Sequence, residues 1–173
     1  DVKNSKENDY PLRQHVFAQK WQLVAQTPRF LSLSSDIETY TGGAHGMVNF
    51  ATLLWDKEKA ASLDPVDIFT SKAAYDAAVS KSFCDGIAAA KRAKGIEPNE
   101  AADGVFESCP KASDHILWLG SSDGKLLDRL TIGITAYVVG PYVEGNYRID
   151  VPMNSALKNA VKPEYAAFVG VKR

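Results

Sequence analysis

Apolar residues recur at every second position over several stretches of this 173-residue chain, which is the pattern of β-strands with one buried face. The stretches are residues 15–26, 30–40, 47–55, 115–119, 129–136 and 147–151. For residues 15–26 an amphipathic helix can also be drawn, and we favour a strand because Thr27-Pro28-Arg29 then forms a short hairpin link. Residues 47–55 and 115–119 are apolar on both sides, which predicts strands that are central or covered by another element.

One long helix is expected between these strands. Thr70 or Ser71 is the expected N-cap, and the helix runs to about Lys94, with Gly95 as its stop. A stripe of large apolar residues recurs every four positions and predicts packing against a sheet: Tyr75, Val79, Phe83 and Ile87. A shorter helix is expected over residues 155–161, and the tail after it carries apolar side chains that we expect to pack.

The order of strands, one long helix and further strands predicts an α+β fold: an antiparallel β-sheet with the helix packed on one face. Asp123-Gly124 is a strong hairpin signal between two of the later strands. Regular alternation of strands and helices is absent, which argues against a parallel doubly wound sheet. We expect residues 1–14 to be a lead-in, the end of a truncated N-terminal element, and residues 15–173 to form a single α+β domain.

Charge and composition exclude some classes of function. The formal net charge is −1 and no basic block is present, so a nucleic-acid partner is not expected. The sequence has no apolar run near the roughly 18 residues of a membrane span. Residues 1–9 are polar and charged and do not form a signal peptide, so a targeting segment or a lipid anchor would lie upstream.

Cys84 and Cys109 are the two cysteines; Cys84 lies on the expected helix, and Cys109 lies in the least regular segment, Ile96–Ser113. We predict a disulfide between them, which would contribute roughly 3–4 kcal/mol by closing a loop of this size. The alternative is two unrelated buried thiols in a reducing cytosol. A disulfide would place the protein in an oxidising compartment.

Two glycine-containing loops interrupt the strand pattern. The first, Tyr40–Gly46, contains Gly42, Gly43 and Gly46; the second, Gly140–Gly145, contains Gly140, Pro141 and Gly145. The simpler interpretation is that each loop is only a tight connection. In the other, the loops meet at one edge of the sheet and present four candidate ligand-binding residues: Tyr40, His45, Tyr142 and Glu144.

Other chemistry has little support in the sequence. The three histidines lie on separate segments, so no metal site is predicted, and neither a nucleophile elbow nor a phosphate loop is present. Glu144 with Asp56 or Asp67 could form a carboxylate pair for glycan chemistry, although surface carboxylates are far commoner. We expect the charged run Asp56–Lys59 to be a solvated turn, and Trp55 and Trp118 to lie in the core.

The two loops together resemble an envelope domain family of unknown function. Their sequences are YTGGAHG and GPYVEG, and the likeness extends to Leu54-Trp55-Asp56, Asp67-Ile68-Phe69 and Val151-Pro152, over residues 21–163. The family occurs in the extracellular part of RsiV-like anti-sigma factors, which bind lysozyme, and beside the catalytic domain of some peptidoglycan deacetylases. It usually carries a further strand and helix before the matching region, which residues 1–14 are too short to supply.

This chain departs from the anti-sigma members by its Cys84/Cys109 pair and by an enlarged loop after the helix. It is more similar to stand-alone Gram-negative members, which look like periplasmic proteins or lipoproteins. The resemblance implies a non-catalytic envelope domain that binds or senses an envelope protein or a glycan, without a cofactor. The alternatives are a cell-wall glycan hydrolase using Glu144 and His45, a module associated with a deacetylase, and a purely structural domain.

Overall fold

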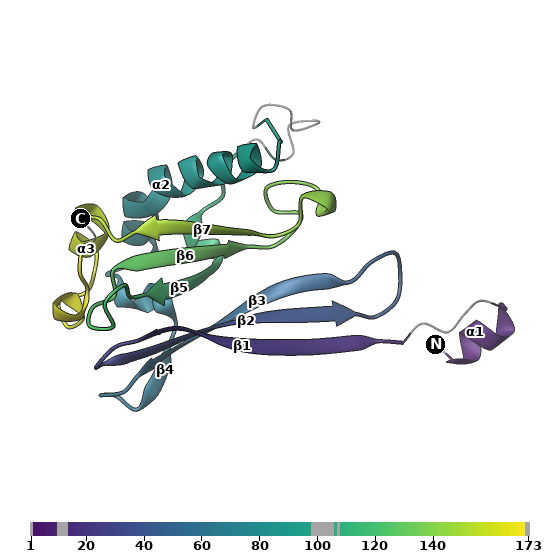
Figure 1. The fold of residues 1–173 in the computed structure, drawn as a ribbon, viewed down its shortest axis with the longest axis horizontal. Helices are drawn as coiled ribbons and strands as arrows, with labels where there is room; N and C mark the ends of the chain where they lie inside the picture. The colour runs from purple at the N-terminus through teal and green to yellow at the C-terminus, as the bar shows by residue number, and fades with distance from the viewer. Residues whose placement is uncertain (1, 10–13, 98–105, 107, 172–173) are drawn as a thin grey trace.

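A computed structural model describes residues 2–9, 14–97, 106 and 108–171 of the chain (Figure 1). Residues 10–13 of the predicted lead-in lie outside the described residues, as do residues 98–105 and 107 of the predicted irregular segment. A short helix, α1 (Val2–Glu7), precedes the first strand.

The described strands form two antiparallel sheets. The first has the order β1 (Val16–Gln26), β2 (Phe30–Tyr40), β3 (Met47–Asp56) and β4 (Ala61–Leu63). The second has the order β5 (Ile116–Gly120), β6 (Arg129–Ile134) and β7 (Tyr147–Pro152). The α+β prediction is therefore confirmed, with the predicted sheet divided into two smaller ones.

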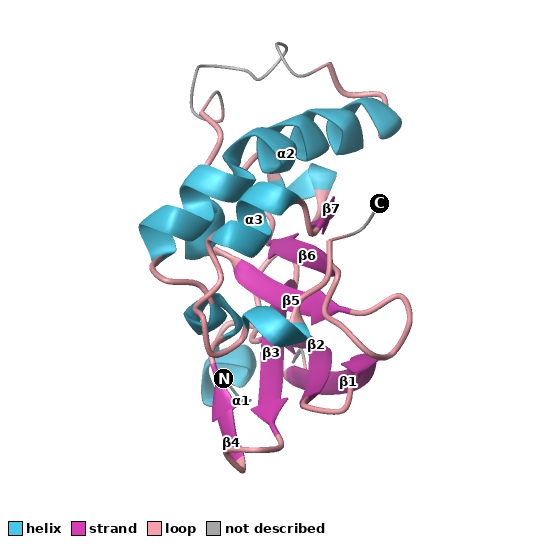
Figure 2. Cartoon of the chain, turned by 90° about the vertical axis from the view of Figure 1, so that its left-hand side faces the viewer, coloured by secondary structure: helices cyan, strands magenta, loops and turns pink. Residues whose placement is uncertain are grey.

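The long helix α2 (Lys72–Ala93) packs on β7, and a short helix α3 (Ser155–Asn159) lies beside it (Figure 2). Ser71 is the N-cap, and its hydroxyl accepts a 3.0 Å hydrogen bond from the backbone N–H of Ala74. The predicted apolar stripe is confirmed as the buried side of α2: Tyr75, Val79 and Phe83 are 0% exposed and Ile87 is 8% exposed.

β5 lies against the first sheet and joins it to the second. The indole N–H of Trp118, a core residue as predicted, donates a 2.9 Å hydrogen bond to the carbonyl of Ala51 in β3. The hydroxyl of Thr52 donates a 2.9 Å hydrogen bond to the carbonyl of Leu117 in β5. These two bonds join β3 to β5, one donated from each strand, and so fix how the two sheets meet.

The predicted disulfide is confirmed: Cys84 of α2 bonds to Cys109, and their Cα atoms are 5.7 Å apart. It ties the segment before β5 to the middle of the long helix. No helix in the described part of the chain is long and apolar enough to cross a membrane.

The charged turn at residues 56–59 corrects one prediction. Asp56 was expected to be solvated, but it is 0% exposed, and Arg29 donates hydrogen bonds to both of its carboxylate oxygens. Burial raises the pKa of Asp56, but the hydrogen bond from Arg29, with those from the backbone of Lys59 and Glu58, outweighs this and lowers it below its ordinary value. Its partner Arg29 lies 27 residues away in sequence, so the local run of charges did not indicate that Asp56 is buried.

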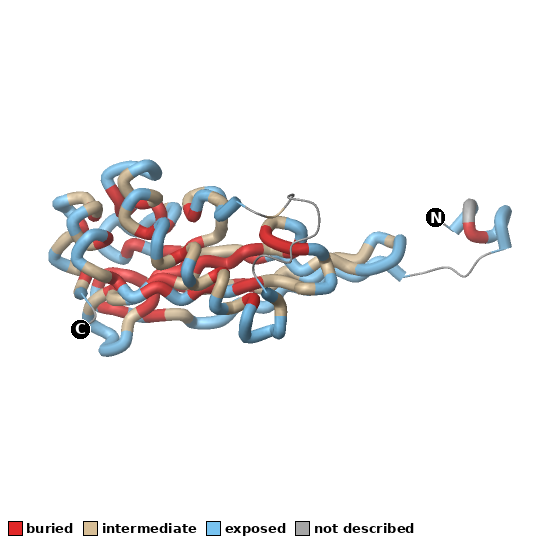
Figure 3. The backbone as a smooth tube through the Cα atoms, turned by 90° about the horizontal axis from the view of Figure 1, so that it is seen from above, coloured by how far each residue is buried: buried red, intermediate tan, exposed pale blue. Residues whose placement is uncertain are grey.

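The other correction concerns the side of the first sheet that faces away from β5–β7. We call this the outer sheet face: residues 17, 19, 21, 23 and, after a bulge, 26 of β1, residues 31, 33, 35, 37 and 39 of β2, and residues 47, 49, 51, 53 and 55 of β3. β3 is central in its sheet, as predicted, but Trp55 on this face is 37% exposed and not in the core. The exposed fractions of Phe17 (70%) and Leu23 (62%) show that no described element covers the face near β1. The start of β1, next to the grey trace, is coloured as exposed in Figure 3.

Candidate functional site

The two glycine-containing loops meet in the folded chain, as the sequence predicted. The hydroxyl of Tyr142 donates a 2.7 Å hydrogen bond to the carbonyl of Gly46. The rings of His45 and Tyr142 stack, with centroids 3.6 Å apart and planes 15° from parallel. The loop after β2 is therefore held against the 3-10 turn Tyr142–Glu144, which precedes β7.

Both nitrogens of the His45 ring have partners, and they define its tautomer. Nδ1 lies 3.0 Å from the carbonyl of Gly46, and because a carbonyl only accepts, Nδ1 carries a proton. Nε2 lies 3.2 Å from the hydroxyl of Tyr137, which donates to it when the ring is neutral. The ring is thus held by its stack with Tyr142 and its hydrogen bond to Tyr137, although it is exposed to solvent.

Tyr137 is a candidate residue that the sequence analysis missed. Its ring is 5.7 Å from that of Tyr142 and 6.3 Å from that of His45, so the three rings form one surface, the aromatic cluster. Tyr137 is 51% exposed and has a backbone φ of 70°, the left-handed region that side-chain-bearing residues seldom adopt. Its backbone N–H donates a 3.1 Å hydrogen bond to the carbonyl of Gly140, which ties Tyr137 to the start of the second loop. No local sequence signal marks such a residue.

Tyr40 lies beside the cluster but is not stacked with it. Its hydroxyl donates a 3.0 Å hydrogen bond to the carbonyl of Gly43. An open groove of about 240 Å³ runs between Tyr40 and Tyr142, bounded by the ends of β1, β2 and β3 and by the side chain of Glu38. The aromatic cluster therefore adjoins a concave surface as well as an exposed one.

Glu144 belongs to a different environment from the other three predicted residues. Its side chain is only 9% exposed, and its carboxylate lies 3.6 Å from the ammonium of Lys91, a buried residue of α2. The hydroxyl of Tyr147 donates a 2.5 Å hydrogen bond to the same carboxylate. Burial, followed by the hydrogen bond to Glu144, raises the pKa of Tyr147. Lys91 and Tyr147 thus engage the Glu144 carboxylate, which anchors the second loop to the helix.

The predicted loop-shaping residues have two kinds of role. Gly42, Gly43 and Gly145 adopt φ values of 102°, 91° and 69°. Gly140 instead allows close approach, because a Cβ there would lie 2.2 Å from a carboxylate oxygen of Glu144. Pro141 caps the 3-10 turn that follows. Gly140 thus makes room for the buried Lys91–Glu144 pair.

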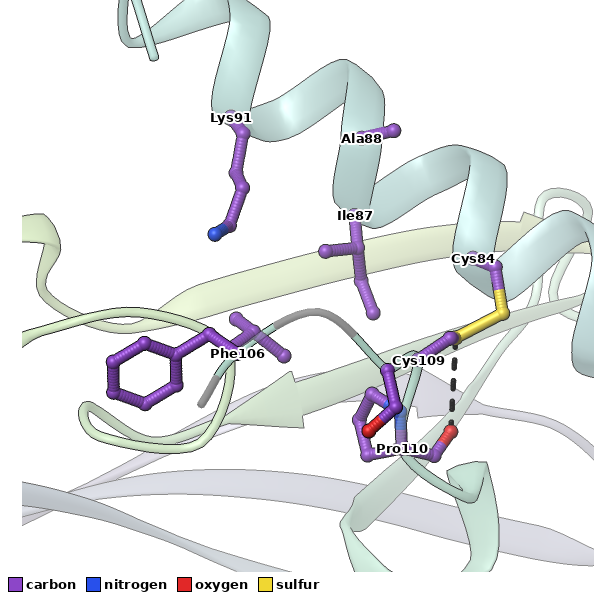
Figure 4. Close-up of a pocket in the computed structure, with 9 residues that line it drawn as sticks. Cys84, Ile87, Ala88, Lys91, Phe106, Cys109 and Pro110 are labelled. Carbon is purple, nitrogen blue, oxygen red and sulfur yellow. Dashed lines mark hydrogen bonds between the residues drawn. A yellow bond between two sulfur atoms is a disulfide. The ribbon is translucent and has the colours of Figure 1, made fainter. Parts of the chain in front are cut away.

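A second cavity of about 120 Å³ lies under α2, next to the disulfide (Figure 4). Ile87 and Lys91 point into it from the helix, and Cys84 and Cys109 lie at its other end. Its one cation, among the lining residues described, is the Lys91 ammonium that pairs with Glu144. Within the described residues, no group of three or more His, Cys, Asp or Glu side chains could hold a metal ion.

Comparisons with known proteins agree with the resemblance inferred from the loops. A family model described as Deacetylase PdaC matches residues 1–48. No curated protein matches the chain. Among solved structures, a DUF3298 family protein from Pseudomonas aeruginosa PAO1 is 19% identical, with a TM-score of 0.59. A DUF3298 family member from Bacteroides fragilis NCTC 9343 is 17% identical, with a TM-score of 0.66.

The structural likeness extends over nearly all of this chain. It covers 97% of the chain and 71% of the Pseudomonas protein, and 96% of the chain and 63% of the Bacteroides protein. At these identities the likeness establishes the fold alone. The chain therefore has the fold of two proteins from a family whose function is unknown, and each of those proteins is longer.

Proposed function

We propose that this chain is a non-catalytic binding module of the bacterial cell envelope that holds a glycan on the aromatic cluster of Tyr137, His45 and Tyr142. The observation that carries the proposal is Tyr137: an aromatic ring exposed to solvent and fixed there by an unusual backbone conformation and a hydrogen bond to His45. Backbone strain of this kind is costly and concentrates at functional sites. An exposed aromatic ring is suited to stacking against the apolar face of a sugar, and Tyr137 is 51% exposed beside the stacked rings of His45 and Tyr142.

A glycan is favoured by the neighbouring groups. The groove beside the cluster is bordered by the hydroxyl-bearing Tyr40 and Thr39 and by the carboxylate of Glu38, which could accept hydrogen bonds from sugar hydroxyls. The Cys84–Cys109 disulfide supports an oxidising compartment, where cell-wall glycans lie. The match of residues 1–48 to the deacetylase family model supports the same setting.

Binding is favoured over hydrolysis because the carboxylates of Glu144 and Asp56, two of those that a glycosidase could use, are each engaged by other side chains. Two carboxylates flank the scissile bond in most such enzymes. Here the Glu144 carboxylate is engaged by Lys91 and Tyr147, and the Asp56 carboxylate by Arg29. The rival assignment of Glu144 and His45 as an acid–base pair therefore lacks support from the contacts of Glu144.

The test is a titration of the chain with a soluble trisaccharide of N-acetylglucosamine, followed by calorimetry and by shifts of backbone amide signals. We expect shifts around residues 40–46 and 137–145, and at least about a fivefold loss of affinity in Tyr137→Ala, the scale expected for losing one stacking aromatic. The matched control is Val143→Ala, because Val143 is 88% exposed in the same loop but outside the cluster.

His45→Ala separates a binding role from a structural one. If His45 contributes to binding, this variant keeps its melting temperature and loses affinity. If His45 only locks the two loops, the variant melts earlier and binds the trisaccharide as well as before. A wild-type protein with no shifts in either loop would contradict the glycan proposal.

A further inference from the structure

The outer sheet face, defined above across β1, β2 and β3, carries no charged residue at any of its fifteen positions. The opposite side of the same strands includes Lys20, Asp36 and Glu38. On the outer face Phe17 is 70% exposed, Leu23 62% and Trp21 45%. An exposed apolar surface of this extent marks an interaction site on a folded protein.

The strand register arranges this face in rows that run across the three strands. In the order β1, β2, β3 the five complete rows are Phe17–Thr39–Met47, Gln19–Ile37–Asn49, Trp21–Ser35–Ala51, Leu23–Leu33–Leu53 and Gln26–Leu31–Trp55. The third row joins the largest side chain of the face to two of its smallest. The second row has an amide at each end and an apolar residue in the middle.

Two copies of this face can be stacked on each other, related by a twofold axis that runs parallel to β2 between the two sheets. In that arrangement each row of one copy lies over the same row of the other, and the side chains of the row are complementary. Such an axis places β1 of one copy over β3 of the other and keeps each row in place. Trp21 then lies over the small Ala51 of the second copy, and the amide of Gln19 lies over that of Asn49. Sheets that stack face to face keep their strands within about 30° of each other, which preserves the match at the centre of the face.

We propose that the outer sheet face binds a second copy of this chain, forming a face-to-face homodimer. A twofold dimer uses the same patch on both copies, which is the property that the rows display. The absence of charge means that no ionic group must be desolvated when two such faces meet. A glycan is a poorer occupant of this face, because ten of its fifteen side chains are apolar and three carry amides: Gln19, Gln26 and Asn49.

The available area is sufficient for a weak pair. With about 150–250 Å² for each large side chain, the exposed fractions of Phe17, Trp21, Leu23 and Trp55 give roughly 300–500 Å² per copy. The partly exposed aliphatic side chains and the exposed amides of the same face bring this to on the order of 600 Å². The pair would then bury about 1,200 Å² in total, the lower end of the range for specific interfaces. This area predicts a dimer that dissociates on dilution.

Sedimentation equilibrium of the chain over a range of concentrations tests the proposal. The expected mass at high concentration is twice the 18.8 kDa of one chain. Leu33→Glu should weaken the dimer at least about tenfold, because the axis brings the two introduced carboxylates together. Val143→Glu adds the same charge at a residue that is 88% exposed and outside the face, so its dimerisation should be unchanged.

An exchange of large and small residues tests the register itself. Trp21→Ala and Ala51→Trp should each weaken the dimer, and the double variant Trp21→Ala/Ala51→Trp should restore it, because the large residue again meets the small one across the axis. Circular dichroism confirms that each variant is folded. A wild-type chain that stays monomeric at about 100 μM, or a double variant weaker than both single variants, overturns the proposal; the first result would leave the face to a different partner.

Discussion

At the scale of single residues, the Arg29–Asp56 ion pair places two opposite charges in the interior of the protein. Both side chains are buried, with 7% and 0% of their surface exposed, and the guanidinium lies 4.5 Å from the ring centre of Phe168. A buried charge is costly when its partner is removed, because the remaining charge has neither water nor a counter-ion. The stability of the fold therefore depends on Arg29 and Asp56 being present together.

Arg29→Met should lower the free energy of unfolding by about 3–5 kcal/mol, because it leaves the Asp56 carboxylate buried and unpaired. The double variant Arg29→Met/Asp56→Asn should lose clearly less than the sum of the two single variants. Urea unfolding measures all three. Lys81→Met is the control: it breaks an exposed pair with Asp85 and should cost less than about 0.5 kcal/mol. Strictly additive losses at residues 29 and 56 would contradict the interpretation.

His115 makes stability depend on pH. Burial lowers its pKa, with Asp114 acting in the opposite direction, and its Nε2 atom is buried with no hydrogen-bond partner among the described residues. Since the pKa is lower in the folded state, the unfolded chain binds more protons below the ordinary histidine pKa of about 6.5. The stabilising contribution of neutral His115 is therefore complete above that value and is lost as the pH falls toward the folded pKa.

His115→Gln should reduce the pH dependence of unfolding between about pH 7.5 and 5.5, where one proton can change stability by at most about 1.4 kcal/mol per pH unit. Urea unfolding at several pH values measures the slope in both proteins. The other two histidines are present in both, so their contributions cancel in the comparison. Equal slopes would show that His115 does not contribute.

At the scale of elements, the α2 interface with β7 depends on a glycine inside a helix. A Cβ on Gly86 would lie 2.4 Å from the Cγ2 atom of Ile149 in β7. Glycine normally weakens a helix by about 1 kcal/mol relative to alanine, so its presence here has a packing reason. The helix can approach the strand closely only because this side chain is missing.

Gly86→Ala should therefore destabilise the protein by about 1–3 kcal/mol, the usual cost of overpacking, in spite of the better helix propensity of alanine. Ser80→Ala on the exposed side of α2 is the control and should be neutral or stabilising by up to about 0.5 kcal/mol. Thermal or urea unfolding distinguishes the two. A stabilised Gly86→Ala variant would mean that α2 can move away from β7 at no cost.

The elements that could be predicted from sequence are those with a local period. Alternation of apolar and polar residues predicted the strands, and an apolar repeat every four residues predicted α2, whose N-cap is Ser71. The burial of Asp56 could not be predicted, because its partner Arg29 lies 27 residues away. The role of Tyr137 could not be predicted either, because no local sequence pattern indicates a positive φ at a residue other than glycine. Alternation shows which side of β3 is apolar, but not whether another element covers it.

At the scale of the whole molecule, the Cys84–Cys109 bond closes a loop with a sequence separation of 25. Reduction should lower the free energy of unfolding by roughly 3–4 kcal/mol, by allowing the unfolded chain more conformations. Urea unfolding with and without a reducing agent measures the difference. The double variant Cys84→Ser/Cys109→Ser is the control and should not respond to the reductant. Two reactive thiols in the unfolded, unreduced protein would contradict the bond itself.

The direction of β1 has a mechanical consequence. The start of β1 lies at one end of the long axis of the molecule and the C-terminus at the other, and β1 runs along that axis beside β2 (Figure 1). A pull between the two ends would therefore slide β1 along β2 and load their hydrogen bonds all at once, instead of peeling them apart one after another. Forced unfolding is governed by the rate of the first rupture. Stretched from its ends, the chain should give way at a high force and in a single step at β1.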